Sequence, residues 1–137
     1  MATINFNNGD VTDIKINGKY DKTNLYLSAE ITIANTSIKI AGHSIINLDG
    51  KASIEDVQFH NHLLDYSFNL YTKLLVVIVD VSKFKIEEKD LEESDQVATC
   101  KLKIEAGDDL INEYSIDDSS KIKSNSVFNF LFTFLKA

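Results

Sequence analysis

Two histidines lie close enough together in this 137-residue chain to suggest metal binding. His60 and His62 are two positions apart, so on a strand both side chains would point to the same side. With Asp56 or Asp65 they could form part of a zinc site. The only other histidine and the only cysteine, Cys100, lie far away in the sequence. We therefore predict exposed imidazoles beside a turn, no metal site and no cofactor.

Paired acids offer a second set of oxygen ligands, at Asp108/Asp109 and Asp117/Asp118. A calcium loop needs an ordered series of oxygen ligands, a glycine at the sharp turn and a closing glutamate. Here Gly107 precedes its acids, and no acid follows with the required spacing. These residues are predicted to be solvated loop charges.

The sequence motifs of common catalytic sites are also absent. The chain has no glycine-rich phosphate loop, no Gly-x-Ser-x-Gly segment and no closely spaced Cys/His pair. The single cysteine, Cys100, is expected to be a small apolar residue beside a strand. We predict no catalytic residues and a protein that is not an enzyme.

The charged residues are unevenly distributed. All 14 basic residues are lysines, and the net charge is −7, which argues against binding nucleic acid. Residues 80–118 hold 13 acids and 5 lysines, so the acidic excess lies there, and this region is a candidate surface for a partner. No apolar run approaches ~18 residues, so no transmembrane segment is expected. The first residues lack the pattern of a signal peptide, which predicts a cytoplasmic protein or one released without a leader.

Along much of the chain, apolar residues recur at every second position. Leu25, Leu27, Ala29, Ile31 and Ile33 alternate with mostly polar residues, as do Ile14/Ile16, Ile38/Ile40, Phe84/Ile86 and Leu102/Ile104. Strands with one apolar face and one solvent-exposed face are typical of antiparallel sheets. The tight turns between strands are predicted at Asn8-Gly9-Asp10, Asn17-Gly18, Asp49-Gly50 and Gly107-Asp108-Asp109. We predict a single β-rich domain over 1–137, a mainly antiparallel sandwich or strongly curled sheet with at most one or two short helices.

Three segments depart from this alternation. Residues 74–79 are continuously apolar, which predicts a central strand buried on both faces. Residues 53–66 fit either a capped helix or a strand in which Val57, Phe59 and Leu63 alternate, and we favour the strand. Residues 87–95 hold six acids and one lysine, which predicts a solvated loop or a short helix.

The last segment carries half of the chain's phenylalanines at every second position. On a strand all four would lie on one face. Burying one phenylalanine contributes ~1.5–3 kcal/mol, so the row must be covered. It could pack in the chain's own core, face an apolar cavity that holds an acyl chain, or dock on a partner. The candidate partner- or lipid-binding residues are Phe128, Phe130, Phe132 and Phe134.

The small size, the Asn/Ile/Lys-rich and arginine-free composition and the opening Phe6-Asn7-Asn8-Gly9-Asp10 resemble clostridial proteins. More narrowly, the chain is similar to the smallest OrfX-type accessory proteins, which are encoded beside botulinum-type neurotoxins. Larger members of that group have tubular lipid-binding (TULIP-like) folds and are thought to associate with one another. The resemblance implies no catalytic residues, and it implies a larger OrfX-type subunit as the partner.

The first functional hypothesis is therefore a non-enzymatic accessory or assembly protein of a bacterial toxin gene cluster that binds another protein. A module that binds lipid or another hydrophobic ligand is the alternative. A structural subunit of a secretion apparatus is a further one.

Overall fold

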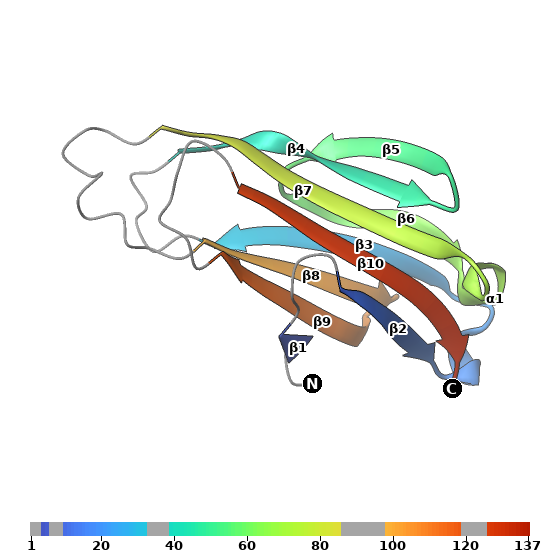
Figure 1. The fold of residues 1–137 in the computed structure, drawn as a ribbon. Helices are drawn as coiled ribbons and strands as arrows, with labels where there is room; N and C mark the ends of the chain where they lie inside the picture. Colours follow the sequence, from blue (N-terminus) through green and yellow to red (C-terminus); the bar gives the residue numbers. More distant parts are fainter. Residues whose placement is uncertain (1–3, 6–9, 33–38, 86–97, 119–125) are drawn as a thin grey trace.

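The computed structural model describes residues 4–5, 10–32, 39–85, 98–118 and 126–137. In these residues two five-stranded sheets pack face to face, which confirms the predicted mainly β sandwich (Figure 1). The first sheet has the order β1 (Ile4–Asn5), β9 (Asp109–Asp118), β8 (Ala98–Ala106), β3 (Asn24–Thr32) and β6 (Phe59–Tyr66). The second sheet has the order β2 (Val11–Ile16), β10 (Ser126–Lys136), β7 (Leu74–Lys85), β4 (Lys39–Leu48) and β5 (Lys51–Asp56). The described helices are a 3-10 turn, η1 (Gly18–Tyr20), and α1 (Ser67–Leu70).

Most neighbouring strands are antiparallel, as the alternation predicted. Two pairs at the edges are parallel, however: β1 with β9 and β2 with β10. The chain therefore contributes its first strand to one sheet and its second strand to the other. Figure 1 shows the C-terminal strand β10 between β2 and β7, in the second sheet.

Two of the predicted turns close hairpins. Asp49 and Gly50 have φ angles of 51° and 90° and join β4 to β5, and Gly107 has a φ of 61° between β8 and β9. Asn17-Gly18 also begins a tight turn, in which the N–H of Tyr20 donates a 3.0 Å hydrogen bond to the carbonyl of Asn17, but it closes no hairpin, because β2 and β3 belong to different sheets. The Asn17 side chain accepts a hydrogen bond from the N–H of Lys19 and caps η1.

The phenylalanine row packs in the core between the sheets. Phe128, Phe130 and Phe132 are 0% exposed and Phe134 is 1% exposed. The ring of Phe132 lies 4.8 Å from that of Tyr114 on β9, so the row contacts the facing sheet. Packing in the chain's own core, the first of the three interpretations, is therefore what the structure shows.

Residues 74–79 do form a central strand, but the prediction that both faces are buried is wrong. In β7 the side chains of Leu75, Val77 and Val79 are fully buried, whereas Leu74 is 42% exposed and Ile78 is half-buried. The reason is that only one side of β7 faces the other sheet, and no described element covers its second side. The apolar run thus provides both a core face and an outward apolar face.

Residues 53–66 are strands, as favoured. They form the end of β5 and the whole of β6; Val57, between the two strands, and Phe59, at the start of β6, are buried. The predicted alternation fails beyond Phe59, since Leu63 is 52% exposed. Here the pairing of β3 with β6 shifts register, and Asn61 has a φ of 54°. The predicted loop or short helix at 87–95 lies outside the described residues.

Candidate functional site

Two neighbouring cross-strand rows on the outer face of the second sheet are mostly apolar; Asn47 lies opposite Val76 in one, and Asn129 lies opposite Ile78 in the other. Cross-strand register places Leu131 of β10 directly opposite Val11 of β2 on one side and Val76 of β7 on the other. In the next row Ile78 lies opposite Ile45, and Ile45 lies opposite Ile54. We call this surface the apolar face; its residues are Val11, Ile45, Ile54, Val76, Ile78 and Leu131.

The apolar face is open to solvent at both edges of the sheet. Val11 is 61% exposed and Ile54 is 74% exposed, while the residues between them are half-buried by their neighbours on the sheet. Such a cluster of aliphatic side chains differs from the scattered apolar residues found on most surfaces. It is therefore the described surface best suited to contact another apolar surface.

Polar side chains border this face at one end. His43 of β4 lies opposite Asp80 of β7 and also opposite Asp56 of β5. Asp80 in turn lies opposite Val127 of β10. An apolar middle with a polar rim is the usual anatomy of a protein interface.

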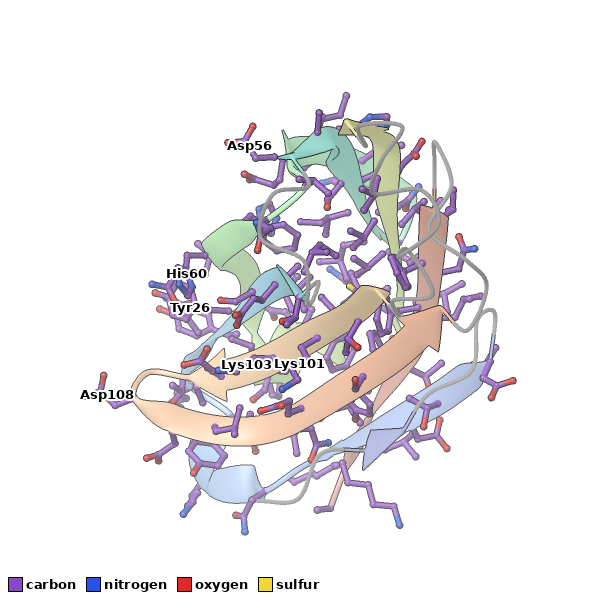
Figure 2. All side chains as sticks on the ribbon, turned by 90° about the vertical axis from the view of Figure 1, so that its left-hand side faces the viewer. Tyr26, Asp56, His60, Lys101, Lys103 and Asp108 are labelled. Carbon is purple, nitrogen blue, oxygen red and sulfur yellow. The ribbon has the colours of Figure 1, made fainter. Side chains whose placement is uncertain are left out.

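A groove of about 470 Å³ marks the outer face of the first sheet. Its cationic groups are Lys101 and Lys103 of β8, which Figure 2 shows near one another on that strand, together with His60 of β6. Each lysine has an acid as a cross-strand neighbour: Lys101 lies opposite Glu30, and Lys103 lies opposite Glu113. Because these charges are compensated, the groove is a weak candidate for an anion site.

One pair in the groove has residue types that occur in nucleophilic catalysis. The hydroxyl oxygen of Ser28 lies 3.4 Å from Nδ1 of His60. That distance is longer than the ~2.6–3.2 Å of an activated nucleophile. Ser28 is 4% exposed and its hydroxyl accepts a hydrogen bond from the N–H of Asn61, so it holds the irregular part of β6 against β3. The pair has a structural explanation.

The two histidines do not share a face, so the prediction about their geometry is wrong. His60 is exposed on the outer side, whereas Nδ1 of His62 lies 2.8 Å from a carboxylate oxygen of Glu55. Glu55 belongs to β5, so this contact joins the edges of the two sheets. The positive φ of Asn61 interrupts the alternation, which is why spacing alone misplaced His62. Among the described residues, no three metal-ligating side chains form a cluster.

The other predicted site residues have separate positions. Asp108 is exposed at the tip of the β8–β9 hairpin (Figure 2), while Asp109 accepts a 2.9 Å hydrogen bond from the Tyr20 hydroxyl. Cys100 faces the core at 0% exposure, as expected for a small apolar residue, and burial raises the pKa of its thiol. Asp117 and Asp118 end β9 and pair with β8, so the predicted loop is wrong there, while their side chains lie outside the described residues.

The alternation of apolar residues does not reveal the apolar face, although the sequence holds a signal for it. In 74–79 no polar residue separates the core positions, so both sides of the strand had to be apolar. The adjacent Ile45 and Ile46 gave the same signal one strand away, since Ile46 is 1% exposed and Ile45 faces outward.

No family model, curated protein or solved structure matches this chain. Among the described residues, no helix is long and apolar enough to cross a membrane.

Proposed function

We propose that this chain is a non-enzymatic assembly protein that binds a partner protein through the apolar face. The observation that carries the proposal is the apolar face, whose members Val11 and Ile54 are exposed at the two edges of one sheet. Apolar surfaces of this kind mark interaction sites on soluble proteins. The polar rim at His43 and Asp80 would fix the orientation of the partner, because charges at an interface contribute specificity.

A protein fits this surface better than a lipid. The phenylalanine row, which motivated the lipid alternative, lies in the core, so binding through it would require the two sheets to separate. The rim of the apolar face carries Asp13, Asp56 and Asp80, and carboxylates are repelled by anionic membrane surfaces. By the family resemblance, the partner would be a larger OrfX-type subunit of a toxin gene cluster.

Photo-crosslinking tests the proposal. A photoreactive phenylalanine analogue replaces Ile78 on the apolar face or, as a control, Tyr26 on the outer face of the first sheet. We expect a protein crosslinked from position 78 and not from position 26, which mass spectrometry then identifies.

Capture alone is not sufficient, so the captured protein is purified and its affinity for the chain is measured. Val11→Lys places a charge on the apolar face at a side chain that is already 61% exposed, and Tyr26→Lys is the matched control. We expect at least about tenfold weaker binding for Val11→Lys only, the effect of burying an unpaired charge. Equal crosslinking from both positions, or unchanged binding by Val11→Lys, contradicts the proposal.

A further inference from the structure

The free edge of β5 is one of the two regular sheet edges among the described residues. The four edge strands are β1, β6, β2 and β5. β1 has two residues, and β6 is interrupted by a register shift. β2 and β5 each pair with their neighbour over six consecutive residues without irregularity, and β5 carries the more exposed edge residue, Ile54 at 74% against Val11 at 61%. A regular exposed edge is a template for pairing with another strand.

The hairpin geometry determines which backbone groups point outward from β5. Leu48 and Lys51 close a two-residue turn in which Asp49 and Gly50 both have positive φ, as in a type I′ turn. The residues that close such a turn hydrogen-bond to each other, and bonded pairs then alternate along the ladder. The N–H and C=O groups of Ala52 and Ile54 consequently point away from β4 toward the free edge.

We propose that a second copy of this chain pairs with this edge, antiparallel to β5 and with Ser53 opposite its own counterpart. In this two-fold arrangement the outward groups of Ala52 meet those of Ile54 in the second copy. Lys51 then lies opposite Glu55 of the second copy, and Glu55 opposite its Lys51. The edge is thus complementary to itself in hydrogen bonding and in charge.

The charges select this register over its neighbours. In a two-fold antiparallel pair one residue lies opposite its own counterpart, and opposite residues share a face of the sheet. The neighbouring registers are therefore those centred on Ile54 or on Ala52 instead of Ser53. With Ile54 opposite itself, Glu55 would face Ser53 and Lys51 would face no acid. With Ala52 opposite itself, Lys51 would face Ser53. Only the register centred on Ser53 places unlike charges opposite each other.

This inference goes beyond the proposed function, because it concerns the edge of the second sheet rather than its outer face. Lys51, Ser53 and Glu55 alternate with the outward-facing Ala52 and Ile54, so their side chains lie on the other side of the strand. Variants at Lys51 and Glu55 therefore change the edge and leave the side chains of the apolar face in place.

Charge reversal with sedimentation velocity tests the proposal. Lys51→Glu alone places acids opposite acids, and Glu55→Lys alone places lysines opposite lysines. We expect the wild type to dimerise with rising concentration, each variant alone to dissociate at least about tenfold more readily, and an equal mixture of the two to form a heterodimer. The circular dichroism spectrum of each variant verifies folding, because Glu55→Lys also removes the contact with His62.

Lys15→Glu on β2, the opposite edge of the second sheet, is the matched control and should dimerise as the wild type does. A wild type that stays monomeric, a mixture that fails to associate, or a dimer lost in Lys15→Glu and kept in Lys51→Glu overturns the proposal.

Discussion

The hydroxyl of Tyr71 donates a 2.6 Å hydrogen bond to Oδ1 of Asp21, a residue 50 positions earlier in the chain. The other carboxylate oxygen of Asp21 lies 3.4 Å from Nζ of Lys136 near the C-terminus, and its carbonyl accepts a hydrogen bond from the N–H of Phe68 in α1. Asp21 therefore joins three distant segments at one end of the sandwich: the connection between β2 and β3, the region of α1 and the end of β10.

This arrangement predicts an acid-dependent loss of stability that Tyr71→Phe reduces. The Tyr71 hydrogen bond, aided by Lys136, holds the pKa of Asp21 below its ordinary value of 3.8 against the opposing effect of desolvation. A lowered folded-state pKa stabilises the fold above the unfolded-state pKa, and this contribution is lost as the pH falls through the folded-state value. Tyr71→Phe should be less stable than the wild type at neutral pH, with a difference that shrinks below about pH 4.

Urea unfolding at a series of pH values measures this difference. Tyr66→Phe is the control, because Tyr66 is 46% exposed and directly precedes α1, whereas the hydroxyl that bonds to Asp21 is that of Tyr71. A difference between Tyr71→Phe and the wild type that stays constant on acidification contradicts the assignment.

The burial of the phenylalanine row predicts that substitutions at two positions on β10 lower the free energy of unfolding by very different amounts. Phe130→Ala removes a ring that is 0% exposed, which should lower the free energy of unfolding by ~3–5 kcal/mol. Leu135→Ala, on the opposite face of the same strand and 43% exposed, should cost less than ~1 kcal/mol. Chemical denaturation of both variants measures the contrast, and equal losses would show that the row is not the core.

The period-two pattern was sufficient to predict the sandwich and most core positions, because alternation depends only on which residues are apolar. It could not predict the positions of His60 and His62, since one residue with positive φ, Asn61, reverses the alternation. It also could not distinguish the turn at Asp49-Gly50 from that at Asn17-Gly18. Both have turn residues, but the second connects different sheets, which is a property of the whole fold.

In the β4–β5 turn, a substitution of Gly50 should change stability through the backbone conformation alone, without side-chain clashes. A Cβ added to Gly50 would meet no atom within 4 Å, but the φ of 90° is unfavourable for any other residue. Gly50→Ala should therefore destabilise the protein by ~1–2 kcal/mol. Asp49→Gly, at a φ of 51°, should cost less than Gly50→Ala or stabilise the turn. Thermal unfolding of both variants checks this order, and a neutral Gly50→Ala would contradict the turn geometry.

Burial of Cys100 predicts a loss of stability at alkaline pH. Desolvation raises the pKa of its thiol well above the ordinary value of 9.0, so above that pH the unfolded chain releases a proton that the folded chain retains. Stability then falls as the pH rises, by at most ~1.4 kcal/mol per pH unit from this group. Cys100→Ala should have a shallower decline between about pH 9 and 10 in urea unfolding, whatever its stability at neutral pH. Parallel declines for the two proteins would contradict the prediction.

The two faces of β7 can be compared at adjacent residues. Val77 is 0% exposed, so Val77→Thr would bury a hydroxyl in an apolar core at a cost of ~1–3 kcal/mol. Ile78 lies half-buried on the apolar face opposite Ile45, so the new hydroxyl of Ile78→Thr can reach water, and its cost should stay below ~1 kcal/mol. Urea unfolding measures both variants, and a large loss for Ile78→Thr would mean that another part of the chain covers the apolar face. If the small loss is found and Ile78→Thr also weakens binding of the crosslinked protein, the cost of the substitution lies in the interface and not in the fold.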